Sequence, residues 1–160
     1  MAHRMTLLLL PFIIIVSLVE PAKTEEPPVI GVSPWEREMS AAIETARSTL
    51  PTFWEKLAAP GADESGFALK AGFPSGWIGS EHVWLIEIER SGETITGVLN
   101  NVPKELKLKE GQRVDITPSR ISDWMFMRGG KIVGNYTLRP LLKRMPPHEA
   151  AQYRELLENP

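Results

Sequence analysis

The spacing of apolar residues changes once along this chain, close to residue 60, and this change limits the folds that the chain can adopt. Before it, from Trp35 to Leu57, apolar residues recur at steps of three and four, the period of an amphipathic helix. After it, apolar and polar residues alternate, as they do in half-buried strands. The sequence therefore predicts a helical amino-terminal layer followed by a sheet, which is an α+β fold.

The helical segment begins with a clear start signal. Ser33 can cap the helix, Pro34 suits its first position, and Glu36 completes a capping box. Pro51 interrupts the backbone hydrogen-bond ladder. The segment is therefore either one kinked helix or two helices that share an apolar face, and we interpret that face as core packing.

The alternating part of the chain predicts an antiparallel sheet of about five or six strands with a short C-terminal helix after it. The first three strands are joined by short turns and should form a meander. Strands are expected at 65–73, 81–90, 94–99, 113–117, 121–127 and 131–137, a helical turn at 139–145 and the final helix at 147–158. Residues 33–160 are thus expected to form a single domain, as the length of 160 residues suggests.

The first 22 residues have the pattern of an export signal. Arg4 precedes the apolar run from Leu7 to Val19, which is shorter than the roughly 17–25 residues of a spanning helix. We expect a signal peptide at 1–22 and an extended linker at 23–32, and hence an exported, periplasmic protein. The alternatives are a segment that stays uncleaved and anchors the protein in the membrane, and a wrongly assigned start codon.

The composition excludes several classes of protein. The chain has no cysteine, which rules out disulfides, cysteine zinc sites and thiol nucleophiles, and its net charge of −2 argues against a nucleic-acid partner. Signatures of phosphate loops, nucleophile elbows and zinc helices are missing. Only His82 and His148 follow the signal segment, and Glu81 and His82 point to opposite strand faces. We therefore expect no metal site and no cofactor.

His82 is the first candidate functional residue. It shares a predicted strand face with Trp84, Ile86 and Ile88. A histidine in this position is either packed and hydrogen-bonded by its neighbours, or it lies in a pocket as a hydrogen-bond donor, an acid or a base. The sequence leaves both interpretations open.

Asp123 is the second candidate, because it interrupts the apolar run from Ile121 to Met127. A carboxylate there must be paired or lie at an edge, since burying it bare is costly. We expect Arg139 to be its partner, with a bond to the backbone as the alternative. A further hypothesis is an anion- or ligand-binding pocket that uses Arg139, Thr137 and His82.

Four short motifs occur in a fixed order: E-H-x-W at 81–84, N-x-P at 101–103, I-x-D-W at 121–124 and G-x-Y-T-x-R at 134–139. Together they resemble the bacterial YegJ-like family, domain of unknown function 2314, over roughly residues 53–142. Each motif alone is unspecific, but the ordered set is specific. The resemblance implies one compact α+β domain and no particular reaction, because the family has none assigned.

The motifs mark the residues that we expect to form a binding site. These are His82, Trp84, Asn101, Asp123, Trp124, Thr137 and Arg139, with Pro103 and Gly134 as further family positions. We expect none of them to be catalytic.

Two functional hypotheses follow. The first is a non-enzymatic module of the cell envelope that presents its sheet and the polar connection at 100–113 to an envelope or secreted protein partner. The missing nucleophile–base pair favours this hypothesis over an enzyme. The second is a small-molecule sensor or enzyme with a pocket around His82, Asp123 and Arg139. Contact with a membrane is expected only if the amino-terminal segment stays uncleaved.

Overall fold

The computed structural model describes residues 33–76, 79–101 and 103–158. The expected signal peptide at 1–22 and linker at 23–32 lie outside the described residues. The elements are α1 (Pro34–Ser48), α2 (Leu50–Ala58), β1 (Glu64–Ser75), β2 (Gly79–Ser91), β3 (Thr94–Leu99), β4 (Arg113–Ile116), the 3₁₀ turn η1 (Pro118–Arg120), β5 (Ile121–Arg128), β6 (Lys131–Gly134), α3 (Leu138–Leu142) and α4 (Pro147–Leu156). This order confirms the predicted α+β fold.

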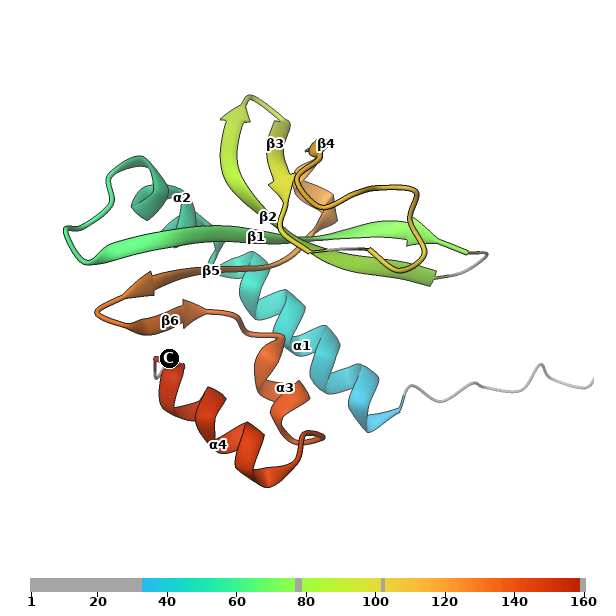
Figure 1. Cartoon of the computed structure of the whole chain (residues 1–160), viewed down its shortest axis with the longest axis vertical. Helices are drawn as coiled ribbons and strands as arrows, with labels where there is room; N and C mark the ends of the chain where they lie inside the picture. The colour runs from blue at the N-terminus through green and yellow to red at the C-terminus, as the bar shows by residue number, and fades with distance from the viewer. Residues whose placement is uncertain (1–32, 77–78, 102, 159–160) are drawn as a thin grey trace, which may run out of the picture. The chain divides into compact units, whose positions relative to one another are not determined.

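The six strands form one sheet in the order β4-β3-β2-β1-β5-β6, and every neighbouring pair is antiparallel. Strands β1 to β3 form the meander that the short turns predicted, and β4 pairs with β3 at its outer edge. The hairpin of β5 and β6 then joins the opposite side of β1, as Figure 1 shows. Strand β1 therefore lies in the middle of the sheet, with β2 on one side and β5 on the other.

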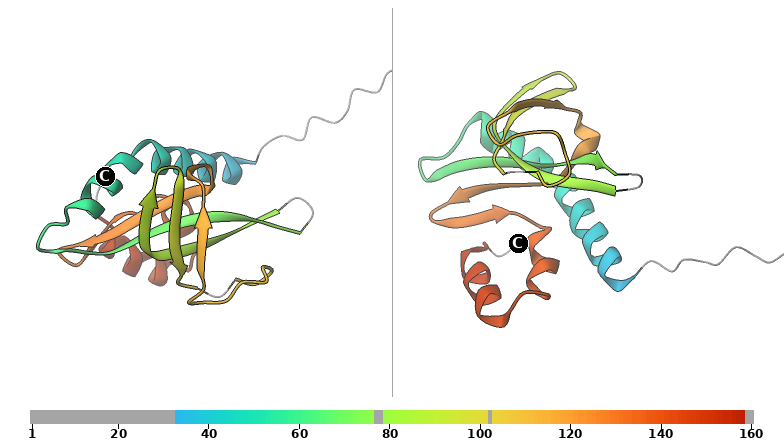
Figure 2. Two further views of the ribbon diagram at one scale, coloured as in Figure 1. Left: turned by 90° about the horizontal axis from the view of Figure 1, so that it is seen from above. Right: turned by 45° about the vertical axis from the view of Figure 1, so that its right-hand side comes forward.

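The amino-terminal helical layer consists of two helices, which decides between the two alternatives. Ser33 accepts a hydrogen bond from the Glu36 backbone and donates its own N–H to the Glu36 carboxylate, so the capping box is formed. Pro51 stands in the first turn of α2, where its missing N–H does no harm. Figure 2 shows α1 and α2 together on one side of the sheet.

The core lies between these helices and one face of the sheet. Its centre is Trp124 on β5, which is 1% exposed and stacks on Phe126 with ring centroids 5.9 Å apart. The indole N–H donates to the backbone oxygen of Ala46 in α1 at 2.9 Å, so this large side chain is buried with its polar atom satisfied. The apolar side chains of the helices, such as Phe53 on α2, pack around the Trp124 ring.

The register of the strands decides which polar residues share a face. Leu69 and Ala71 of β1 join the core, so Lys70 between them lies on the opposite face. Lys70 is paired with Trp84 on β2 and with Asp123 on β5. Side chains opposite one another on neighbouring strands are close together, so these three residues form a group on that face.

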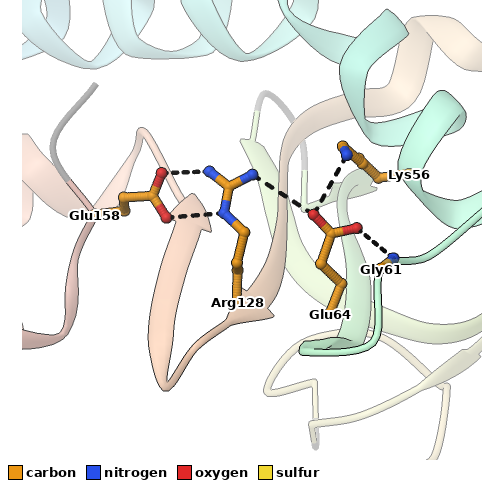
Figure 3. A network of polar contacts seen from close by, with 5 residues as sticks. All are labelled: Lys56, Gly61, Glu64, Arg128 and Glu158. Atoms are coloured by element: carbon orange, nitrogen blue, oxygen red, sulfur yellow. Dashed lines mark hydrogen bonds and ion pairs between the residues drawn. The ribbon is translucent and has the colours of Figure 1, made fainter.

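A network of charged side chains joins the first residue of β1, Glu64, to the last described residue, Glu158 (Figure 3). The Glu64 side chain, only 3% exposed, accepts the Gly61 N–H at 2.8 Å and pairs with both Lys56 and Arg128 at 3.5 Å. Arg128 also forms a two-point contact with Glu158. This network fixes the α2–β1 connection and holds Glu158 beside β5.

Candidate functional site

A pocket of about 230 Å³ opens where β1, β2, α1 and α3 meet. Within the described residues, β6 pairs only with 125–128 of β5, so the first half of β5 is left without a strand on that side. Helix α1 takes part on both sides of the sheet beside this free edge of β5, because Ala46 packs in the core whereas Met39 and Ile43 line the pocket. Helix α1 also contacts α3. The pocket has an apolar wall from the two helices and polar residues around it: Met39, Ile43 and Leu141 form the wall, and Lys70, His82 and Thr137 are polar.

Lys70 supplies a positive charge to this pocket. Its ammonium donates a hydrogen bond to the Thr137 hydroxyl at 2.8 Å and lies 4.8 Å from the centroid of the Trp84 ring. Burial lowers the pKa of Lys70, and the nearby charge of Asp123 opposes that shift. The site thus holds an ammonium group in apolar surroundings, where its interaction with an anion is strengthened.

Asp123 lies behind Thr137 and is fully buried. Its carboxylate accepts the Thr137 hydroxyl at 2.6 Å, the Thr137 N–H at 2.8 Å and the Tyr136 N–H at 3.0 Å. Burial raises the pKa of Asp123, while the bonds from Thr137 act in the opposite direction. The carboxylate therefore anchors the segment that follows β6, and its expected bond to the backbone is confirmed.

The turn after β6 presents these backbone N–H groups to Asp123. Gly134 and Asn135 both have positive φ, of 82° and 50°, which turns the chain out of the sheet. A Cβ at Gly134 would lie 2.4 Å from the backbone oxygen of Trp124, so only glycine fits. The predicted strand at 131–137 was therefore too long, because alternation continues in the sequence beyond the residue where the backbone leaves the ladder.

His82 lies at the exposed rim of the pocket. Its Nδ1 lies 2.8 Å from the hydroxyl of Ser122. Ser122 is the extra residue of a β-bulge in β5, opposite Lys70 and Ala71 of β1. Desolvation of the ring, together with the charges of Lys70 and Arg47, lowers the pKa of His82. The imidazole is thus both bonded by a neighbour and in contact with the pocket, so each of the two sequence interpretations describes part of its environment.

Ser122 itself is not arranged as a nucleophile. Its side chain is 1% exposed, and its hydroxyl donates to the backbone oxygen of Lys70 at 3.3 Å. A catalytic hydroxyl must reach the substrate and give its proton to the neighbouring base. The Ser122–His82 contact therefore orients the imidazole and does not activate the serine.

Three of the expected site residues are brought together at this pocket, and two others support it. His82 and Thr137 line it and Asp123 lies directly behind Thr137. Trp84 contacts Lys70 with its ring, and its backbone N–H donates to the Asn101 side chain at 2.7 Å. Asn101 therefore fixes the loop after β3 to β2. Trp124 belongs to the core, on the opposite face from Asp123.

Arg139 does not belong to this pocket, and the expected Asp123–Arg139 pair is wrong. Arg139 donates to the backbone oxygen of Glu158 at 3.1 Å and lines two other surface pockets. The physical reason is the turn at Gly134 and Asn135, which places Thr137 against Asp123 and leaves Arg139 two residues further along α3, near the end of the chain.

Lys70 is the site residue that the sequence did not reveal. The alternation in β1 placed it on the polar face, where a lysine is usually in solvent. With the observed register, His82 and Asp123 lie on the same sheet face as Lys70, opposite the core. This grouping of polar residues is the signal that could have identified Lys70. That register could not be derived from the sequence, since it depends on the bulge at Ser122.

The helices of the described residues are too short or too polar to cross a membrane. Nor do 33–76, 79–101 and 103–158 contain a group of three or more histidine and acidic side chains arranged to hold a metal ion. The polar group at the pocket consists instead of a lysine, a histidine, a threonine and a buried aspartate.

Comparison with known proteins identifies relatives over most of the domain. Residues 36–157 match the family described as "Uncharacterized protein conserved in bacteria (DUF2314)". The chain is 37% identical to the uncharacterized protein YegJ of Escherichia coli strain K12 over 123 residues, covering 76% of this chain and 78% of that protein. The resemblance inferred from the four motifs is confirmed.

A second relative is larger. The chain is 31% identical over 126 residues to a protein of Neisseria meningitidis serogroup B that is named as an ankyrin repeat protein. The match covers 74% of this chain and 50% of that protein, so half of the relative has no counterpart in the aligned region. No solved structure matches the chain significantly.

Proposed function

This chain belongs to the DUF2314 family of uncharacterised bacterial proteins, and we propose that it is a non-enzymatic binding module. Its ligand is a small molecule with one anionic group and an apolar part, held in the pocket around Lys70. The proposal is carried by one observation: the Lys70 ammonium, bonded to Thr137, stands among apolar side chains at the junction of two helices and the sheet.

The two sides of the pocket indicate the chemistry of the ligand. Lys70 has three donor hydrogens, and its bond to Thr137 uses one of them. An anion that accepts another gains a charge-assisted bond in apolar surroundings. Met39, Ile43 and Leu141 offer a surface for an apolar group. Pockets for drug-sized ligands have about 300–1,000 Å³, so a pocket of 230 Å³ suits a smaller molecule such as a short-chain carboxylate.

A non-catalytic role is favoured by how the reactive groups are bonded. The Ser122 hydroxyl is buried and donates to a backbone oxygen, and the Asp123 carboxylate accepts bonds from Thr137 and Tyr136. Both groups are therefore already hydrogen-bonded within the protein. The remaining polar groups at the pocket, Lys70 and His82, suit the binding of an anion.

The test is to titrate the purified full chain with hexanoate, hexanamide and hexanol by isothermal titration calorimetry. We expect hexanoate to bind and its neutral analogues to bind at least about 10-fold more weakly, because hydrogen bonds to charged groups contribute about 1.5–3 kcal/mol. Lys70→Met should weaken hexanoate binding by about 10–100-fold, whereas Lys104→Met, on an exposed loop residue, should leave it unchanged. Equal binding by Lys70→Met and wild type would contradict the proposal.

We further propose that the module works in the cell envelope. The support is the sequence of the leader, in which Arg4 precedes the apolar run from Leu7 to Val19. Affinity purification of the tagged protein from an envelope fraction, with mass spectrometry of its amino terminus, tests this proposal. A mature chain that begins near residue 23 supports export, and the same sample reports any envelope protein partner. Recovery of intact chain from the cytosol alone would contradict it.

A further inference from the structure

The position of the proton on His82 follows from its contact with Ser122. The Ser122 hydroxyl lies 2.8 Å from His82 Nδ1 and 3.3 Å from the backbone oxygen of Lys70. A hydroxyl has one hydrogen, and a carbonyl oxygen can only accept. When that hydrogen points to the carbonyl, Nδ1 donates to the serine oxygen, and we assign this tautomer to the neutral ring, with its basic lone pair on Nε2.

The orientation of the ring is also fixed from the side of β1. A Cβ built at Gly72, the residue opposite His82, would lie 3.2 Å from the ring carbon Cε1. The imidazole therefore lies against the backbone of β1, in space that a side chain at Gly72 would crowd. Gly72 and Ser122 together hold the ring at the rim of the pocket that Lys70 and Thr137 also line.

The charges around His82 come from three elements. Lys70 on β1 and Arg47 on α1 act on the ring as positive charges, and Arg47 is held by the backbone oxygens of Ser119 and Ile121 at 3.1 and 2.7 Å. Asp123 on β5 is separated from the pocket by Thr137. The other pocket residues, from α1 and α3, carry no charge. An empty pocket is therefore positive near the imidazole, which opposes a second proton on the ring.

We propose that the pocket takes up its anionic ligand together with one proton, which binds to Nε2 of His82. The ligand's carboxylate then lies between the Lys70 ammonium and the His82 imidazolium. The step is balanced: the protein with a neutral His82 ring, the carboxylate and one proton give a complex in which the imidazolium and the carboxylate are paired. This inference rests on the proposed function, and it adds that the ligand is a carboxylate whose affinity depends on pH.

The reason for the coupling is electrostatic. A bound carboxylate offsets the repulsion from Lys70 and Arg47 and adds an attraction for the imidazolium. The pKa of His82 is lowered in the free protein by desolvation and by these two charges, and a bound carboxylate should raise it. Between these two values each fall of one pH unit should strengthen binding by up to about 10-fold. Carboxylic acids remain ionised in this range, because their usual pKa is about 4.

The test is calorimetric titration of the full chain with hexanoate at pH 7 in bis-Tris and in Tris buffer, whose ionisation enthalpies differ and whose buffering species do not compete for an anion site. We expect the observed enthalpy to depend on the buffer in the direction of proton uptake, with about 0.5–1 proton per ligand, for one coupled histidine. His82→Gln should still bind hexanoate but lose both the buffer dependence and the pH dependence. His148→Ala removes a side chain that is 77% exposed and should behave as wild type.

The outcomes separate the two proposals. Binding by the wild type without proton uptake, or uptake that persists in His82→Gln, overturns the coupling and leaves the anion pocket standing. Absence of hexanoate binding by the wild type overturns both. If His82→Gln does not fold, the signals of His82 in proton NMR of the wild type decide: hexanoate must raise the titration midpoint of His82.

Discussion

Thr137 donates both its backbone N–H and its hydroxyl to the carboxylate of Asp123, at 2.8 and 2.6 Å. The same hydroxyl accepts the bond from Lys70. One threonine therefore connects a buried negative charge with a positive charge at a pocket. The relationship explains why the I-x-D-W and G-x-Y-T motifs occur together: Asp123 shapes the turn that brings Thr137 to the wall of the pocket.

Asp123→Asn should destabilise the fold. An amide has one acceptor oxygen, and its NH₂ group would face donors from Thr137 or Tyr136. We expect a loss of about 1–3 kcal/mol in the free energy of unfolding, measured by urea denaturation. Asp63→Asn, at an exposed position, is the matched control and should change stability by less than about 0.5 kcal/mol. Equal effects of the two changes would show that Asp123 does not organise the turn.

Gly134→Ala should be more damaging than Gly130→Ala. Both glycines have positive φ, of 82° and 78°, but a Cβ at Gly134 would lie 2.4 Å from the Trp124 backbone oxygen, whereas one at Gly130 meets nothing within 4 Å. Gly130→Ala should cost about 1–2 kcal/mol, from the backbone conformation alone. Gly134→Ala should cost more, or prevent folding, as thermal unfolding followed by circular dichroism will show. Similar melting temperatures would contradict the close contact.

The stability of the ligand-free protein should depend on His82 in mildly acidic solution. Because the pKa of His82 is lowered on folding, the unfolded chain binds more protons between that lowered value and 6.5. Wild type should therefore lose stability as the pH falls from 6.5 through this window, and His82→Gln should lose less. Urea denaturation of both proteins across pH 5–7.5 measures the difference. Parallel curves would be inconsistent with the lowered pKa.

Within the charged network of Figure 3, Glu64 should contribute more to the stability of the protein than Glu158 does. The Glu64 side chain is 3% exposed and meets two cations and a backbone N–H, whereas that of Glu158 is 35% exposed. Glu64→Gln should therefore lower the melting temperature more than Glu158→Gln does, and added salt should weaken the contribution of the more exposed pair first. The reverse order would mean that the Arg128–Glu158 contact is the more important part.

Sequence alone predicted the fold well because its signals were local. The capping box at Ser33, the proline in the helical layer and the strict alternation from Phe67 to Phe73 each act within a few residues. Short turns between the first strands then left an antiparallel meander as the simple arrangement. The element that was misjudged, the end of β6, was decided by a distant atom: the backbone oxygen of Trp124 beside Gly134.

The candidate site could be predicted only in part. His82, Asp123 and Thr137 were recognised as unusual residues, and the structure brings them to one pocket. Lys70 was overlooked and Arg139 was given the wrong partner. In both cases the contacts of the side chain depend on details of strand register and backbone conformation. A one-residue bulge at Ser122 and two positive φ angles after β6 decide which side chains meet, and no periodicity in the sequence reports either feature.

The most direct test of the central claim is an assigned amide NMR spectrum of the isotope-labelled full chain during titration with hexanoate. We expect saturable shifts that are concentrated around Lys70, His82 and Thr137, and nearly absent around Arg139. Shifts centred on Arg139, or no saturable shifts at all, would contradict a ligand pocket built on Lys70.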